Sequence, residues 1–290
     1  IPESKAPRPR RFDPVGQVLV LVMLASVTYG IIEGPNLGWS STVILGAFSA
    51  SALSLAGLVF YEPRRGEPLI DLRFFRSIPF SSSIVILIAA FAAFGGFLFL
   101  STLYLQKVRD LSPVHAGLVT VPMAMMLVAF SPISGRMVGR RGPRLPLLVA
   151  GVCSVVACVM LTGLDEGTSY AWLIAAYVVF GIGMGFVNAP VTNAAVSGMP
   201  RAQAGVASAI ATTSRQFGQT IGVAVIGAIV ASGAGGTVSA ELTSASVPAW
   251  WTLAAFGAAV LVFGLVATSR RAERSAHRTA TAPNPEALAE

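Results

Sequence analysis

The stretch FSSSIVILIAAFAAFGGFLFLSTLY, residues 80–104, contains no charged side chain and is long enough to cross a membrane as a helix. A bilayer core of about 30 Å takes roughly 20 helical residues at a rise of about 1.5 Å each. Because lipid cannot hydrogen-bond to the backbone, such a stretch must be a helix that closes its own hydrogen bonds. A barrel strand is excluded, since its apolar and polar residues would alternate with a period of two.

Further apolar stretches of similar length lie on both sides of this one. They run over residues 15–32, 42–60, 116–138, 145–163, 170–196, 204–231 and 249–268. The composition agrees, because 54% hydrophobic and 11% charged residues do not fit a soluble domain of 290 residues. The sequence therefore predicts an all-α membrane protein with eight transmembrane helices in one membrane domain.

The basic residues predict the orientation of these helices. Seventeen of the 20 Lys and Arg residues lie at the two ends of the chain or in every second gap between apolar stretches. They are Lys5, Arg8, Arg10, Arg11, Arg64, Arg65, Arg73, Arg76, Arg136, Arg140, Arg141, Arg144, Arg201, Arg270, Arg271, Arg274 and Arg278. The intervening gaps hold only Lys107 and Arg109. Because Lys and Arg are retained in the cytoplasm, we expect both termini there.

The net charge of +7 follows from the same pattern. It indicates contact with anionic lipid rather than with nucleic acid, because the arginines are dispersed over loops and tails instead of a folded basic domain. Residues 1–14 and 62–79 are expected to be cytoplasmic linkers and 269–290 a disordered cytoplasmic tail. The segment EPLIDLRFFR, residues 67–76, suits either the membrane interface or a solvated loop. A first residue inside a linker suggests that the chain is the back part of a longer protein.

One charged side chain, Arg215, is predicted to lie deep in the membrane, about 16 Å along its helix from Ala204. Ionisable groups at that depth are costly and are usually functional. It shares one helix face with a polar stripe of Ser208, Thr212, Gln219 and Gly222. Two interpretations stay open: Arg215 lines a translocation path or gate, or it extends toward the cytoplasm and ties two helices together.

Glycines and one proline predict close helix packing. Gly218 and Gly222 form a G-x-x-x-G pattern, which lets a neighbouring helix approach closely. A second stripe over residues 170–196 contains Tyr177, Gly181, Gly185, Asn188 and Thr192, with Pro190 as an expected kink. The glycines favour tight packing, while Asn188 is a candidate cavity contact.

Groups that would support other chemistry are missing from the apolar stretches. All 13 Asp and Glu residues lie outside them, so these helices supply no carboxylate for a proton relay. A Ser/His/Asp set, a His-rich metal cluster and a phosphate-binding loop are equally missing, which argues against an embedded enzyme and predicts no metal and no cofactor. Cys153 and Cys158 point to different sides of one helix and predict no disulfide, and His115 is expected to be a polar helix cap.

Five sequence strings resemble one family of transporters. They are PES (2–4), EPLIDLRFFR (67–76), YLQKVRDLSPVHAGLVTVP (104–122), GRMVGRRGPRLP (135–146) and GVASAIATTSRQFGQTIGVAVIG (205–227). Together they resemble the fourteen-helix drug:proton antiporters of the major facilitator superfamily, over roughly residues 1–232. The resemblance implies that the chain is the last eight of fourteen helices, with residues 15–61 as the central helix pair and 80–268 as the C-terminal six-helix bundle.

The resemblance also implies a function and partners. The complete protein would be a proton-driven multidrug efflux antiporter of the bacterial inner membrane that exports hydrophobic or cationic small molecules by alternating access. Its partners would be the lipid bilayer, substrates, protons and the missing N-terminal six-helix bundle. Two other classes remain open: a non-transporting structural or regulatory membrane protein, such as a degenerate half-transporter, and an embedded enzyme.

Candidate site residues follow from this resemblance. Arg215, Gln216 and Gln219 are expected to form a polar wall or gate, Asn188 a second cavity contact, and Tyr104 with Gln106 an element of the outer end. Gly135, Arg140, Gly142 and Arg144 match the family's cytoplasmic loop motif, although Gly139 replaces its Asp and Pro143 an Arg. These replacements keep the turn and the positive charge, which favours a role in fixing topology over gating.

Overall fold

The computed structural model describes residues 13–64, 75, 77–196, 204–233, 239–269, 271–272 and 274–275. Over these ranges the regular elements are all helices. Most of the expected linkers 1–14 and 62–79, Arg201 and most of the expected tail 269–290 lie outside the described residues. The helices in chain order are α1 (Pro14–Leu37), α2 (Thr42–Tyr61), η1 (Glu62–Arg64), α3 (Ile78–Leu103), η3 (Tyr104–Val108), α4 (Pro113–Arg141), α5 (Arg144–Met160), α6 (Tyr170–Gly185), α7 (Asn188–Val196), α8 (Ala204–Gly233) and α9 (Ser239–Ala267).

Six segments of the described chain are long and apolar enough to cross a membrane. They are Pro14–Gly34, Thr42–Tyr61, Ile78–Val108, Pro113–Arg141, Tyr170–Ala194 and Thr243–Ala267. The two remaining predicted spans correspond to α5 and α8. α5 is apolar but has only 17 residues, and α8 has 30 residues but carries Arg215, Gln216 and Gln219. The count of eight transmembrane helices therefore stays a prediction.

The predicted helix over residues 170–196 is divided into α6 and α7. The division falls at Phe186 and Val187, just before Pro190. Proline has no N–H for the helical hydrogen bond, and its ring clashes with the carbonyl four residues earlier, which here belongs to Phe186. Pro190 is thus accommodated in the first turn of α7, and the expected kink becomes a full break.

Serine caps and a glycine define the ends of several helices. Ser41, Ser112 and Ser169 accept hydrogen bonds from the first-turn N–H groups of α2, α4 and α6. At α4, the His115 ring also pairs with the Ser112 hydroxyl, with 2.7 Å between Nδ1 and Oγ. α4 ends at Gly142, whose φ of +79° is readily adopted only by glycine.

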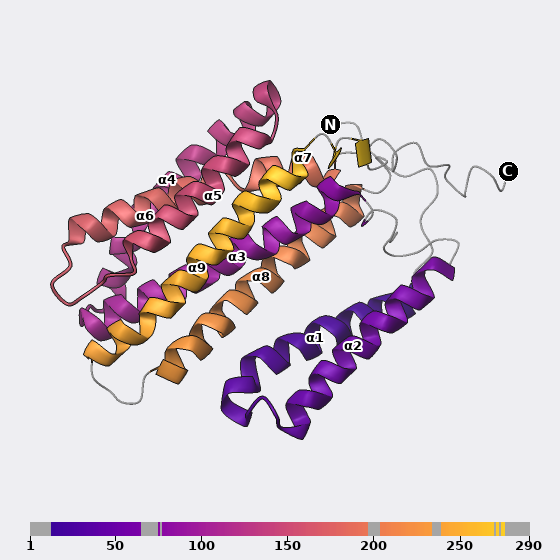
Figure 1. The fold of residues 1–290 in the computed structure, drawn as a ribbon, viewed down its shortest axis with the longest axis horizontal. Helices are drawn as coiled ribbons and strands as arrows, with labels where there is room; N and C mark the ends of the chain where they lie inside the picture. Colours follow the sequence, from indigo (N-terminus) through magenta and orange to yellow (C-terminus); the bar gives the residue numbers. More distant parts are fainter. Residues whose placement is uncertain are drawn as a thin grey trace.

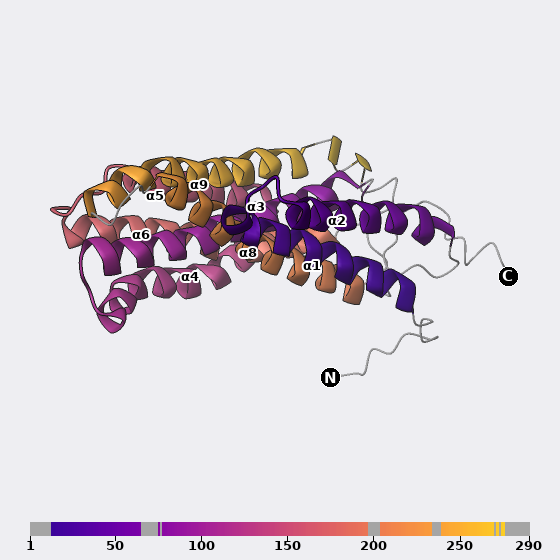
Figure 2. The ribbon, with the colours of Figure 1, turned by 90° about the horizontal axis from the view of Figure 1, so that it is seen from below.

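The helices form one bundle with a helix pair beside it (Figure 1). α3 lies in the middle of the bundle and contacts both α8 and α9, while α5 packs on α9 and α6, and α4 packs on α6. α1 and α2 pack mainly on each other, and α1 also contacts α8. Seen from the second direction, the long helices again run roughly along one axis (Figure 2).

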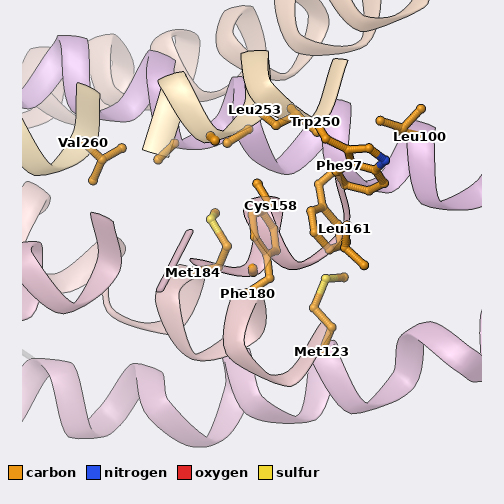
Figure 3. Packing of buried hydrophobic residues seen from close by; sticks show 14 of the residues in the cluster. Phe97, Leu100, Met123, Cys158, Leu161, Phe180, Met184, Trp250, Leu253 and Val260 are labelled. Atoms are coloured by element: carbon orange, nitrogen blue, oxygen red, sulfur yellow. The ribbon is translucent and has the colours of Figure 1, made fainter. Parts of the chain in front are cut away.

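An aromatic cluster fills the centre of the bundle. Phe97 of α3 is fully buried, and its ring stacks on Phe180 with 3.9 Å between centroids. Tyr177 and Trp250 each make a T-shaped contact with Phe97, with centroids 5.5 and 5.6 Å away. Figure 3 shows Phe97, Phe180 and Trp250 meeting from three helices. This core joins α3, α6 and α9 and leaves the opposite side of α3 to face α8.

Candidate functional site

The candidate site begins at the interface of α3 and α8, where small residues bring two parallel helices together. Along this interface, a Cβ on Gly218 would clash with the backbone of Ile88, and a Cβ on Gly222 with that of Ala92. On the opposite side, a Cβ on Gly95 would lie 2.6 Å from the Gln219 carbonyl oxygen. Only glycine permits this spacing, so the two backbones are held in direct contact.

Two cavities open beside this contact. One has a volume of about 550 Å³ and lies between α1 and α8, with Ile32, Asn36, Phe99, Gln216, Gln219 and Thr220 among its lining residues. The other, of about 370 Å³, lies between α8 and the C-terminal part of α3 with η3, and Gln106 and Lys107 line it. Phe99, Gln219 and Val223 line both cavities, so the two adjoin.

Arg215 lies one helical turn before Gln219 on α8. It is half-buried, and its guanidinium carbon lies 5.9 Å from the centroid of the Phe91 ring on α3. Its Nε is buried and has no hydrogen-bond partner among the described residues. The side chain therefore contacts α3 through an aromatic face, although it lines neither cavity. Whether it acts in a pathway or only in packing stays a prediction.

The C-terminal end of α3 is fastened to the loop before α6. At η3 the helix widens to a π-helix, a form that often occurs at functional sites. The buried Tyr104 hydroxyl donates to the carbonyl of Asp165 at 2.6 Å. Arg109 donates to the carbonyl of Thr168 at 2.5 Å and lies over the Tyr170 ring, with 4.4 Å from Cζ to the centroid. The hydrogen bond to Tyr104 raises the pKa of Arg109, so this cation is firmly charged.

The residues predicted on the sixth apolar stretch lie elsewhere in the bundle. A Cβ on Gly181 would clash with the backbone of Met123, and one on Gly185 would lie 2.9 Å from Cβ of Phe130. Both glycines thus face α4. Asn188 is half-buried in the first turn of α7 and lines neither of the two cavities around Gln219. The structure does not bring it together with Arg215, Gln216 and Gln219.

The predicted loop motif forms the junction of α4 and α5. Arg140 and Arg144 are exposed on either side of Gly142, whose positive φ makes the turn. A Cβ on Gly135 would meet no atom within 4 Å, so neither its conformation nor its packing requires glycine. Arg140 lies in the last turn of α4, where a positive charge interacts favourably with the helix dipole.

Sequence reasoning found three polar residues of the cavities, Gln106, Gln216 and Gln219, but missed other parts of the site. Among the polar lining residues it missed Asn36, Thr102, Lys107 and Thr220. Phe99 and Val223 are apolar residues inside apolar stretches, and nothing in the pattern distinguishes them from residues that face lipid. Arg109 was missed as well, although a signal was present. Lys107 and Arg109 are the only basic residues in the gaps assigned to the outer side, and that exception marked η3 as unusual.

Comparison with known proteins identifies the family of this chain. Residues 14–223 match the model of the Major Facilitator Superfamily. The chain belongs to this superfamily. Among its relatives, it is 34% identical to the multidrug resistance protein Stp of Mycobacterium tuberculosis over 245 residues. It is also 32% identical over 247 residues to the tetracenomycin C resistance and export protein of Streptomyces glaucescens, and 32% identical over 233 residues to the multidrug efflux pump LfrA of Mycolicibacterium smegmatis.

These matches cover different shares of the two chains compared. They include 84%, 85% and 79% of the present chain but only 45%, 46% and 45% of the three relatives in the same order. The chain therefore spans about half the length of the curated relatives that it matches. Membership in the Major Facilitator Superfamily, together with the apolar helices, makes the chain a multi-pass membrane protein of a transporter family rather than an enzyme.

Proposed function

We propose that this major facilitator chain forms the last eight helices of a fourteen-helix, proton-driven multidrug antiporter. The complete protein would export hydrophobic small molecules by alternating access, with proton influx driving one bundle against the other. The observation that carries the proposal is the wall that α3 and α8 form: amide side chains and Phe99 line two adjoining cavities next to a glycine-packed contact. Mostly apolar cavities with a few polar groups are typical of small-molecule sites.

The helix arrangement supports the assignment of the chain to the second half of such a protein. α1 and α2 would be the central helix pair, and α3 to α9 the C-terminal bundle, in which α6 and α7 together make one span. If the chain is the second half of such a protein, it should match only about half of each relative, and it does. Reading the codons upstream of Ile1 tests it: we expect six further hydrophobic segments in frame, and a stop codon in their place would contradict it.

An exposed apolar face on α4 supports the proposed partner, the N-terminal six-helix bundle. Val114, Leu118, Val121, Met125 and Val128 recur at helical spacing along α4, and each is exposed. Such a face needs a cover of lipid or protein. In the proposed arrangement part of it would contact the other bundle.

The predicted site residues receive roles within this proposal. Arg215, Gln216 and Gln219 would form the wall or gate, while Tyr104 and Gln106 would belong to the outer end. Asn188, which lies apart from the two cavities, would act as a separate contact from α7. Gly135, Arg140, Gly142 and Arg144 would fix the cytoplasmic turn, with both termini on the cytoplasmic side of a bacterial inner membrane.

Dye export by the full-length gene product tests the proposal. Cells that express it should extrude a hydrophobic fluorescent dye, and a protonophore should abolish the extrusion. Arg215→Ala should lower the export rate about tenfold at unchanged membrane expression, because it removes a charge from the α3 contact. Arg136→Ala, which removes an exposed arginine of α4 outside both cavities, should not. Export that persists without a proton gradient would contradict the coupling, and unchanged export in Arg215→Ala would assign that residue to packing alone.

A further inference from the structure

The smaller cavity is lined by one continuous face of α3 and η3. Gly95, Leu98, Thr102 and Gln106 recur at intervals of three or four residues, and Lys107 follows directly. Gln219 and Val223 of α8 provide the opposite side. The cavity thus has an apolar inner part and a polar end, and its volume of about 370 Å³ lies within the range of small-molecule sites.

The two glutamine amides that line this cavity make no hydrogen bond with another described residue. They belong to Gln106 and Gln219, and both residues are half-buried. Buried and half-buried amides usually pair with protein, water or a ligand. Phe99 adds an aromatic face beside them. These groups are available to an oxygen-bearing aromatic molecule.

The charge of the cavity is positive. Lys107 is the charged residue in its lining, and no acidic residue of the described ranges lines it. Arg109, two residues further on, is already engaged by Thr168, Tyr104 and Tyr170, whereas Lys107 makes no ion pair or hydrogen bond with a described side chain. Glu33 lines neither cavity; it accepts a hydrogen bond at 3.4 Å from Asn36, which lines the neighbouring one. Arg215, one turn before Gln219, adds a second positive charge on the same helix interface.

We propose that this cavity binds the anionic end of planar aromatic substrates, with Lys107 as the charge partner. The amides of Gln106 and Gln219 donate hydrogen bonds to substrate oxygens, and Phe99 contacts the aromatic body. The wall thus selects carboxylates and phenolates over cations of the same shape, because a cation would meet Lys107 without a compensating carboxylate. This substrate class keeps the hydrophobic part of the class predicted from the sequence but replaces its cations by anions, and it rests on the transport function proposed above.

Two dyes with the same xanthene core and opposite charge test the selectivity. Fluorescein is an anion near pH 7.4 and rhodamine 123 a cation, and export of each would be measured with the full-length protein in everted membrane vesicles. We expect the unaltered protein to prefer fluorescein. Lys107→Gln should raise the KM for fluorescein about tenfold, equivalent to about 1.4 kcal/mol, and change that for rhodamine 123 less than about twofold. Lys107→Glu should reverse the preference. Arg136→Gln removes one positive charge as well, but outside the cavity, so it should leave the KM for both dyes unchanged.

The outcomes separate this inference from the proposed function. A preference for rhodamine 123 in the unaltered protein, or a dye ratio that Lys107→Glu leaves unchanged, would overturn the inference while transport itself stands. Export of other hydrophobic compounds with neither xanthene dye accepted would overturn it too. Failure of the unaltered protein to export any compound of a broad panel would instead overturn the proposed function.

Discussion

α1 and α3 are similar apolar helices in sequence but have very different surroundings in the structure. Of the most apolar part of each span, 11% is buried in α1 and 61% in α3. Hydropathy alone accounts for neither value, since lipid and protein interior are about equally apolar. α3 differs by its small residues, Ala92, Gly95 and Gly96, which let α8 and α9 approach its backbone. Apolar content thus predicts that a helix inserts into the membrane, whereas small residues decide which helix packs at the centre of the bundle.

Truncating one leucine on each helix should give the largest difference. Leu100→Ala on α3 removes a side chain that is 1% exposed and leaves a cavity, which costs about 2–5 kcal/mol. Leu21→Ala on α1 removes one that is 67% exposed, and lipid or detergent fills the space. Unfolding of both variants in a denaturing detergent titration measures the two costs. Equal losses of unfolding free energy in the two variants would show that α1 is as closely packed as α3 in the complete protein.

Enlarging a glycine should give the next largest effect. In Gly222→Leu the new side chain would clash with the backbone of Ala92, and such overpacking costs about 1–3 kcal/mol or more because two helices must separate. Gly46→Leu on α2 is the matched control, since a Cβ there meets no atom within 4 Å. Thermal melting of the purified variants should show a lower Tm for Gly222→Leu alone. A comparable drop for both would refute the special role of the α3–α8 contact.

Removing one hydroxyl should give the smallest effect. Tyr104→Phe deletes the hydrogen bond from η3 to the carbonyl of Asp165 and leaves that carbonyl without its donor, at a cost of about 1 kcal/mol. Tyr29→Phe on α1 removes the hydroxyl of an exposed tyrosine that makes no hydrogen bond within the described residues. The same melting assay should resolve the first change and show none for the second. Identical Tm values for the two variants would mean that η3 is not held by Tyr104.

Much of the helical framework was predictable because uncharged stretches of membrane length leave the backbone no alternative. The limits of the helices were less predictable. α9 begins at Ser239, earlier than the expected residue 249, because a helix continues through polar residues that hydropathy places outside the membrane. The break at Phe186 was expected only as a kink, since the sequence shows Pro190 but not how the neighbouring helices accommodate it.

The candidate site was predictable only where a polar residue interrupts an apolar stretch. Gln216 and Gln219 stand out for that reason, and both line a cavity. Phe99 lines the same cavity but resembles the other aromatic residues of α3 in sequence. Asn188 was selected by the same polar criterion and lies elsewhere, because helical spacing fixes a face of one helix and not the neighbour that this face meets. The bonds of Tyr104 and Arg109 to residues 165 and 168 depend on how separate helices assemble.

The central claim is that the α3–α8 wall lines the substrate pathway of the complete transporter. Substrate protection of a cysteine at Gln219 tests it most directly, in a full-length protein without other cysteines, using a membrane-impermeant maleimide. Gln219→Cys should react readily, and a transported dye should slow the reaction at least about threefold. Gly167→Cys, in the exposed loop before α6, should react at the same rate with and without the dye. An unreactive Gln219→Cys, or labelling that the dye does not slow, would contradict the account.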